Sequence, residues 1–331
     1  MTKKASILRK WLFALLHIVG FVLLWAIIRD LEWAEFRVLL ITIPLWKYLA
    51  GLAVLGIVYA LKSLRWHLLN KTFGIRTTWR MALVFYLSAG FMSVITPGRL
   101  GEFAKIYFLK RKYDIDIPSA TSSVFLDRIW DVLVLSAAAG ISVVMLLADP
   151  GLNMLSLILI GLLFLVSLLV ILMPSFVFIP LLYLLRRFSG LHDKIQDVYQ
   201  LWKESRFKNF ASALSMTALA FLLLAGIPVL FSLGTPYPIL YTTGIGAISV
   251  SNILSFLPVT VAGFGTRELV FVEVWKLSDY PKELALSIST AYFMVTYLGS
   301  LLLGGLVYLL HMKDLYRPSE IRKMTAGESE E

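Results

Sequence analysis

The sequence predicts an all-α polytopic membrane protein with six full spans and two re-entrant helical hairpins, arranged as an inverted-topology repeat. Three observations predict this fold: the excess of apolar residues, the lengths of the apolar runs, and the positions of the basic residues. Of 331 residues, 59% are hydrophobic and 16% are charged, and the mean hydropathy is +0.80. Soluble domains are about half apolar and carry about 25% charged residues. The composition therefore excludes a soluble enzyme and a nucleic-acid-binding protein, and the net charge of +10 reports membrane topology.

Six apolar runs are long enough to cross the hydrocarbon core, which takes about 20 residues in a helix. The first run lacks a small-residue cleavage site, so we expect a retained helix in place of a signal peptide. We predict a single transmembrane domain over 1–310, with repeat one at about 11–148 and repeat two at about 152–310. The polar tail at 311–331 is predicted to be cytoplasmic and disordered. The six runs lie at 11–28, 48–66, 132–148, 152–174, 210–233 and 284–310.

Two further segments, 81–112 and 239–277, are predicted to be hairpins that enter the membrane and return to the same side. If every apolar run crossed the membrane, more basic residues would lie outside than inside, against the positive-inside rule. The rule is satisfied when 81–112 enters from the cytoplasm and 239–277 enters from outside. Both termini are then cytoplasmic, the protein lies in the cell membrane, and the two halves repeat with opposite orientation, as in many secondary transporters. The basic residues left outside are Arg29, Arg37, Lys47, Lys276 and Lys282.

Each predicted hairpin contains a Gly- and Pro-rich break beside an Arg and a Glu. Proline ends the preceding helix, and glycine permits a tight reversal. Broken backbone inside hydrocarbon is tolerated only where protein or a watery cavity covers it. The alternative is a pair of interfacial turns whose charged side chains reach water. The first break contains Pro97, Gly98 and Gly101 with Arg99 and Glu102, and the second contains Pro258, Gly263 and Gly265 with Arg267 and Glu268.

A third charged cluster, Asp127, Arg128 and Asp131, lies at the start of the span at 132–148. The two aspartates are four residues apart and share one helix face. A charge at a helix centre costs about 2.5–3.5 kcal/mol on insertion scales, so these groups must pair, reach the interface or line a polar cavity. The arginines and carboxylates of the three motifs nearly cancel in charge. We predict an intramembrane cavity, and purely structural pairing is the alternative.

Arginine suits a phosphate ligand, because its planar fork holds two oxygens and stays charged when desolvated. Glu102 and Glu268 either orient the arginines or carry a proton. Arg65 with Trp66 ends the second span, either as an interfacial anchor or as a substrate contact. The predicted substrate-binding residues are Arg65, Arg99, Glu102, Asp127, Arg128, Asp131, Arg267 and Glu268.

We predict no catalytic residue, metal site or cofactor. The absence of cysteine excludes disulfides, zinc–thiolate sites and a thiol nucleophile. The histidines lack metal-ligand spacing, and no phosphate-binding glycine loop or dinucleotide fingerprint is present. A polar stretch at 186–208 carries Leu191, Ile195, Val198 and Trp202 at helical spacing. This pattern predicts an amphipathic helix on the membrane surface, with a solvated linker helix as the alternative.

Taken in order, these motifs resemble the lysylphosphatidylglycerol synthase transmembrane-region family of flippase-like integral membrane proteins. The resemblance covers about 10–310, with Asp127 standing where the family often has Glu. It implies translocation of a phospholipid or of a phosphate-linked lipid of the polyprenyl type. Some members are fused to an aminoacyl-phospholipid synthase domain and others are linked to glycosyltransferases; neither domain is recognisable here, so the resemblance implies no enzymatic activity. The motifs are Arg65-Trp66, Pro97-Gly98-Arg99-Leu100-Gly101-Glu102, Asp127-Arg128-x-x-Asp131 and Gly263-Phe264-Gly265-Thr266-Arg267-Glu268.

The preferred hypothesis is a lipid flippase or transporter that carries a headgroup through the charged cavity while the tails stay in the bilayer. A second hypothesis is a membrane-embedded headgroup transferase or hydrolase with Glu102 or Asp127 as general base. A third is a non-catalytic partner that regulates another membrane enzyme through the basic helix at 186–208. The predicted partners are membrane lipids with an anionic or phosphate-bearing headgroup and, under the third hypothesis, a lipid-modifying enzyme; no nucleic acid is expected.

Overall fold

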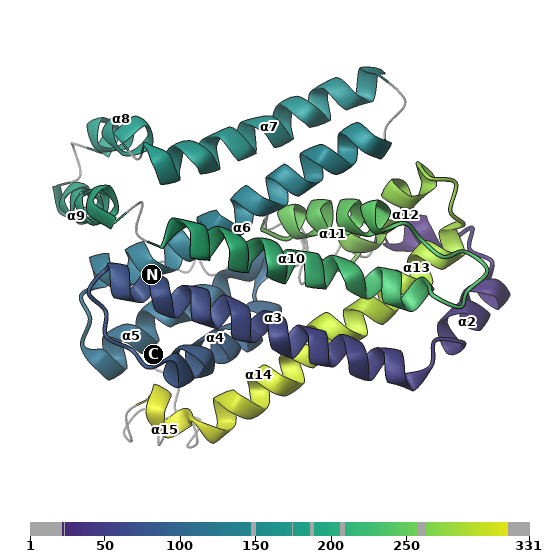
Figure 1. Cartoon of the computed structure of the whole chain (residues 1–331), viewed down its shortest axis with the longest axis horizontal. Helices are drawn as coiled ribbons and strands as arrows, with labels where there is room; N and C mark the ends of the chain where they lie inside the picture. Colours follow the sequence, from purple (N-terminus) through teal and green to yellow (C-terminus); the bar gives the residue numbers. More distant parts are fainter. Residues whose placement is uncertain are drawn as a thin grey trace, which may run out of the picture.

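Every regular element that the structure describes is helical (Figure 1). Most of the predicted first span at 11–28 lies outside the described residues, and the tail after 316 lies outside them entirely. The computed structural model describes residues 22, 24–146, 150–173, 175–185, 189–205, 209–256 and 263–316.

Three helices in these ranges are long and apolar enough to cross a membrane, so the all-helical membrane class is confirmed. The first of them along the chain, Leu45–Thr72, has 28 residues and is about 42 Å long at a rise of 1.5 Å per residue. It is therefore longer than the hydrocarbon core of a bilayer, which is about 30 Å thick. They are α3 (Leu45–Thr72), α10 (Phe210–Ser232) and the continuous helix formed by α13 (Lys282–Phe293), the π-helical turn η3 (Met294–Leu298) and α14 (Gly299–Leu310).

The segment at 81–112 turns back on itself. The Thr78 side chain accepts a hydrogen bond from the Met81 amide at 3.3 Å and so caps the entering helix. The returning helix ends at Asp114 in the left-handed conformation. The rings of Phe85 and Tyr113 lie 6.3 Å apart, so the end of the returning helix lies beside the first half of the entering one. The elements are α4 (Trp79–Val94), the 3₁₀ helix η1 (Pro97–Phe103) and α5 (Ala104–Tyr113).

The segment at 239–277 also forms a hairpin, made of α11 (Tyr241–Phe256) and α12 (Thr266–Lys276). The Leu240 amide donates to the Tyr280 hydroxyl at 3.2 Å, so the start of α11 and the chain after α12 lie together. In Figure 1 this junction lies at the end of the molecule near α2 (Trp33–Ile41), opposite the end that holds α5. Pro258, predicted as part of the second break, lies outside the described residues.

The two halves of the chain interlock through these hairpins. Helix α4 packs on α14, and α11 packs on α6 (Ile117–Leu146). Helix α3 packs on α10, and α2 packs on α13. Gly304 permits the contact of α14 with α4, because a Cβ there would lie 2.6 Å from the Leu87 carbonyl oxygen.

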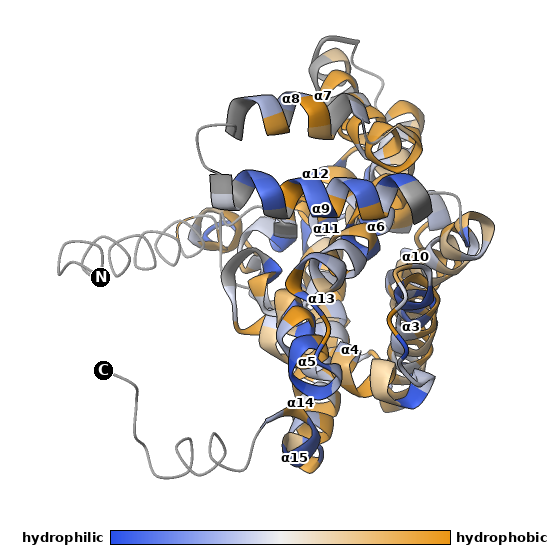
Figure 2. Ribbon diagram, turned by 90° about the vertical axis from the view of Figure 1, so that its left-hand side faces the viewer, coloured by the Kyte–Doolittle hydropathy of each residue, from blue (hydrophilic) through white to orange (hydrophobic). Residues whose placement is uncertain are grey.

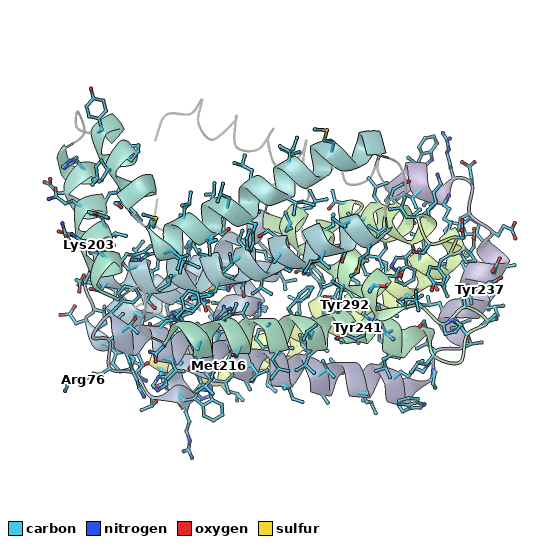
Figure 3. The ribbon with its side chains drawn as sticks, turned by 45° about the horizontal axis from the view of Figure 1, so that its top comes forward. Arg76, Lys203, Met216, Tyr237, Tyr241 and Tyr292 are labelled. Carbon is cyan, nitrogen blue, oxygen red and sulfur yellow. The ribbon has the colours of Figure 1, made fainter. Side chains whose placement is uncertain are left out.

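The polar stretch at 186–208 forms α9 (Ser189–Ser205), which follows α7 (Pro150–Leu172) and α8 (Ser175–Leu185). Trp202 is buried, its Nε1 donates to the Ser122 carbonyl at 3.3 Å, and its ring packs edge-on against Phe178. Much of the apolar face of α9 is therefore covered by α6 and α8. Hydrophilic residues of α5, α9 and α15 (Met312–Leu315) lie at the end of the molecule that faces the viewer in Figure 2. In Figure 3, Arg76 and Lys203 lie at one end and Tyr237 at the other.

Candidate functional site

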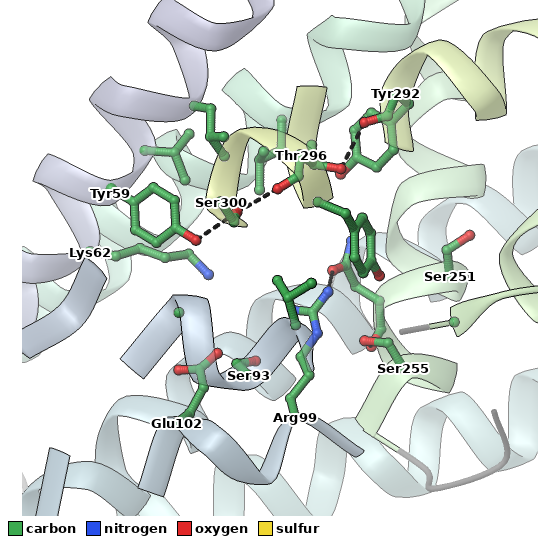
Figure 4. Close-up of a pocket in the computed structure, with 18 of the residues that line it drawn as sticks. Tyr59, Lys62, Ser93, Arg99, Glu102, Ser251, Ser255, Tyr292, Thr296 and Ser300 are labelled. Atoms are coloured by element: carbon green, nitrogen blue, oxygen red, sulfur yellow. Dashed lines mark hydrogen bonds between the residues drawn. The ribbon is translucent and has the colours of Figure 1, made fainter. Parts of the chain in front are cut away.

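Both breaks contribute to the wall of one cavity, which encloses about 1000 Å³ of empty space including its open side. Its walls come from α3, α4, η1, α11, α12 and the π-helical turn η3. In the described part of the wall the cationic side chains are Lys62, Arg99 and Arg267, and the carboxylate is Glu102. Figure 4 shows Lys62, Arg99 and Glu102 around this space. Irregular backbone at membrane depth is expected where it lines such a cavity.

The first break places Arg99 in the cavity. The Thr96 hydroxyl accepts from the Gly101 amide at 2.7 Å and donates to the Met92 carbonyl at 3.0 Å, which ties η1 to the end of α4. Arg99 has a φ of 56°, in the left-handed region that non-glycine residues seldom adopt. Its Nη2 donates to Oδ1 of Asn252 on α11 at 3.1 Å (Figure 4). The break in the first hairpin is therefore bonded directly to the second hairpin.

The second break holds Arg267 through Glu268. Gly263 and Gly265 have φ values of 73° and 83°, which glycine adopts without strain. The Gly265 amide donates to Glu268 Oε2 at 2.8 Å, and Glu268 also pairs with Arg267. The guanidinium lies 4.5 Å from the ring centre of Phe293, a cation–π contact. Its Nη1 is buried and has no hydrogen-bond partner among the described residues.

A buried ion-pair network lies beside the cavity, with Arg65 at its centre. Its Nε and Nη2 donate to Asp127 at 2.6–3.0 Å, and its Nη1 donates to Asp131 and to Thr217 at 2.7 Å each. These contacts occupy all five guanidinium N–H groups. Arg65 is fully buried and is not among the cavity-lining residues. Arg65 therefore connects α3, α6 and α10. This buried position fits neither the interfacial anchor nor the substrate contact that the sequence suggested.

The network reaches the cavity through Glu102 and Lys62. Arg128 pairs with Glu102 and donates to the Tyr86 hydroxyl at 2.9 Å. Lys62 Nζ lies 3.1 Å from Asp131. Lys105 is fully buried, with its Nζ 2.8 Å from Asp127 and 3.7 Å from Glu102. A smaller neighbouring cavity shares Lys62 and Arg99 with the main one.

The structure therefore places the predicted residues in two layers. Arg99, Glu102 and Arg267 line the cavity, with Glu268 directly behind Arg267. Asp127, Arg128, Asp131 and Arg65 form the network beside it. Five further residues that the motifs did not predict line the cavity or pair beside it: Lys62, Lys105, Tyr59, Asn252 and Tyr297.

A helical-spacing signal for two of the missed residues was available. Lys62 lies three residues before Arg65, and Lys105 lies three residues after Glu102, so each shares a helix face with a predicted residue. The hydroxyl-bearing residues on one side of the cavity, Tyr59 and Ser300 among them, carried no comparable signal in the sequence. There, the Tyr59 hydroxyl donates to Ser300 at 2.8 Å, and Ser300 donates to the Thr296 carbonyl (Figure 4).

The profile of the family described as the lysylphosphatidylglycerol synthase TM region matches residues 11–304. The chain belongs to this family. The match confirms the resemblance drawn from the motifs, and it includes both breaks and the Asp127 cluster. A UPF0104 membrane protein of Methanocaldococcus jannaschii, MJ1078, is 21% identical over 245 residues, which are 70% of this chain and 99% of that protein. The cavity thus lies within the region that defines the lysylphosphatidylglycerol synthase TM family.

Proposed function

We propose that this member of the lysylphosphatidylglycerol synthase TM family is a lipid translocator that moves an anionic, phosphate-bearing headgroup across the membrane through the cavity. One observation carries the proposal. Among apolar helices, the described wall presents Lys62, Arg99 and Arg267 and a single carboxylate, Glu102, which pairs with Arg128. Guanidinium groups hold phosphate oxygens in pairs, and an ammonium group adds a point charge.

Two buried polar atoms in the wall support an oxygen-rich ligand. Arg267 Nη1 and the Ser251 hydroxyl oxygen both have no hydrogen-bond partner in the described ranges. Leaving such a group buried and unpaired costs about 1–3 kcal/mol. Each of these groups can donate to a phosphate oxygen, which would remove that cost.

Transport requires the cavity to open alternately to the two sides, and an inverted repeat of six spans and two hairpins provides the means. The packing pairs are consistent with such a repeat. In such a repeat α3 corresponds to α10, α4 to α11, α2 to α9, and α6 to α13 and α14. Exchanging corresponding helices converts the α4–α14 contact into the α11–α6 contact and the α2–α13 contact into the α9–α6 contact. The α3–α10 contact is unchanged by the exchange. In this arrangement the end with Arg76 and Lys203 faces the cytoplasm, together with both termini, in the cell membrane.

Headgroup transfer or hydrolysis is less well supported by the geometry. A general base must accept a proton from its substrate. Glu102 is held by Arg128 and Lys105, and Asp127 is held by Arg65 and Lys105. Both carboxylates are therefore already bonded to cations of the protein, and neither is placed to bond a substrate proton alone. A lipid-modifying enzyme as partner stays a prediction.

Reconstitution into vesicles tests the proposal. The purified protein should accelerate transbilayer movement of acyl-labelled phosphatidylglycerol above the rate in protein-free vesicles. The variants Arg99→Gln and Arg267→Gln should each slow it about tenfold, because a hydrogen bond to a charged group contributes about 1.5–3 kcal/mol. Arg37→Gln, at an exposed position in α2, should transfer lipid at the wild-type rate. Equal rates with and without wild-type protein for every anionic lipid tried would contradict the proposal.

A further inference from the structure

We propose that the cavity contains a second subsite, a strip of hydroxyl oxygens that accepts hydrogen bonds from hydroxyl groups on the headgroup alcohol. The inference rests on the proposed function and specifies its substrate class: a phosphodiester whose headgroup alcohol is a polyol. The hydroxyl strip is formed by Tyr59, Thr296 and Ser300, which line the cavity. Figure 4 shows these three side chains in a row along one side of the space.

The single proton of each hydroxyl in the strip is already engaged within the protein. The Tyr59 hydroxyl donates to Ser300 Oγ at 2.8 Å, and Ser300 donates to the Thr296 carbonyl. Thr296 Oγ1 donates to the Tyr292 carbonyl at 2.7 Å. A hydroxyl has one proton and two lone pairs, so these bonds leave each oxygen with at least one lone pair and no proton to offer. The hydroxyl strip therefore accepts hydrogen bonds from a ligand and does not donate them.

The second hairpin offers the same chemistry through Ser255 on α11. Its hydroxyl donates to the Asn252 carbonyl at 2.7 Å, and it also lines the cavity. The acceptors of the strip are buried, with 9% of Thr296 and 5% of Ser300 exposed. An apolar headgroup alcohol would displace water from these oxygens without replacing its hydrogen bonds, which is unfavourable. The cavity should therefore favour a headgroup alcohol that donates.

The hydroxyl strip adjoins the arginine expected to hold the phosphate. Tyr297 follows Thr296 in the turn η3, and its ring centre lies 5.2 Å from the Arg267 guanidinium carbon. The alcohol of a phosphodiester held by Arg267 is then within reach of the strip. Both hydroxyl and ammonium groups donate hydrogen bonds. Lys62, Arg99 and Arg267 share the wall and repel an ammonium group, so hydroxyl groups are the favoured donors.

The test compares phosphatidylglycerol with phosphatidylpropanol, in which a propyl group replaces the glycerol of the headgroup. The two lipids carry the same single negative charge and the same tails, and only the first has headgroup hydroxyls. Acyl-labelled forms are assayed at the same low mole fraction in vesicles that contain the purified protein. Phosphatidylglycerol should cross about tenfold faster, a difference that two hydrogen bonds can provide.

Variants of the acceptors test where the preference arises. Thr296→Val keeps the side-chain shape and removes one acceptor, so the preference for phosphatidylglycerol should fall to about threefold or less. Ser255→Ala removes an acceptor from α11 and should narrow the ratio as well. The matched control is Thr290→Val in α13, which loses an equivalent bond to the Leu286 carbonyl and is not among the described cavity-lining residues. It should keep the wild-type ratio.

The outcomes separate this inference from the function on which it rests. If neither lipid moves faster than in protein-free vesicles, the proposed function fails and the subsite with it. If phosphatidylpropanol crosses as fast as phosphatidylglycerol, the translocator stands and the polyol subsite is overturned. If phosphatidylethanolamine, assayed alongside, crosses faster than phosphatidylglycerol, the strip takes an ammonium group and the assignment to hydroxyls is overturned. If Thr296→Val and Ser255→Ala keep the wild-type ratio or slow both lipids equally, these side chains do not select the headgroup and the subsite is overturned.

Discussion

Replacing Arg65 with methionine should leave little correctly folded protein. Arg65 satisfies Asp127 and Asp131 at once, and all three side chains are nearly or fully buried. Removing one partner from a buried pair costs about 3–5 kcal/mol, because a carboxylate is left uncompensated. A typical net stability is about 5–15 kcal/mol. The yield of monodisperse protein in detergent and its thermal midpoint by circular dichroism should both fall sharply.

Two further variants make this expectation specific. Arg29→Met removes an ion pair with Asp30 in which both side chains are more than half exposed, and should leave the midpoint unchanged. Arg65→Lys keeps the charge and loses the planar fork, so its midpoint should lie between those of the wild type and Arg65→Met. An Arg65→Met protein as stable as Arg29→Met would contradict the role assigned to the network.

Replacing Gly101 with alanine should dislodge η1 from α4 and abolish lipid transfer. A Cβ at this position would lie 2.2 Å from the Met92 carbonyl carbon and 2.4 Å from the Ser93 amide nitrogen. Both are backbone atoms, so no side-chain rotation relieves the clash. Overpacking of this kind costs about 1–3 kcal/mol or more. The displaced η1 would also carry Arg99 away from Asn252.

The matched control for Gly101→Ala is Gly56→Ala, in the middle of α3. A Cβ there meets no atom within 4 Å. Alanine in a helix is favoured over glycine by about 0.5–1 kcal/mol, so this variant should be slightly more stable and fully active. If Gly101→Ala transferred lipid as fast as Gly56→Ala, the predicted clash between the new Cβ and the backbone of α4 would be contradicted. The measurements are the thermal midpoint and the lipid-transfer rate of both variants.

The helical class and the sites of the two breaks were predictable because their signals are local. Long apolar runs specify helices in a membrane, and the glycines and proline at 97–101 interrupt one such run. The surface placement predicted for 186–208 depended on an amphipathic pattern alone. Amphipathicity does not say what covers the apolar face, and α6 and α8 cover much of it here.

The pairing of the charged side chains in the site could not be read from the motifs. Arg99, Arg128 and Arg267 nearly cancel the carboxylates of the three motifs. Tertiary packing brings Lys62, Lys105 and the predicted Arg65 beside the same carboxylates. Asn252 was also beyond sequence reasoning, because an amide within an apolar helix carries no sign of the partner that it meets 153 positions away.

Single cysteines in this cysteine-free chain test most directly whether the space between the hairpins is the path of the headgroup. Ser93→Cys on α4 and Ser255→Cys on α11 place a thiol in the cavity wall with little change in size, and Ser167→Cys places one in α7, outside the cavity lining. An anionic, water-soluble thiol reagent should modify the first two and stop lipid transfer, and leave Ser167→Cys unmodified and active. Transfer that continues at the wild-type rate after complete modification of Ser93→Cys and Ser255→Cys would contradict the account.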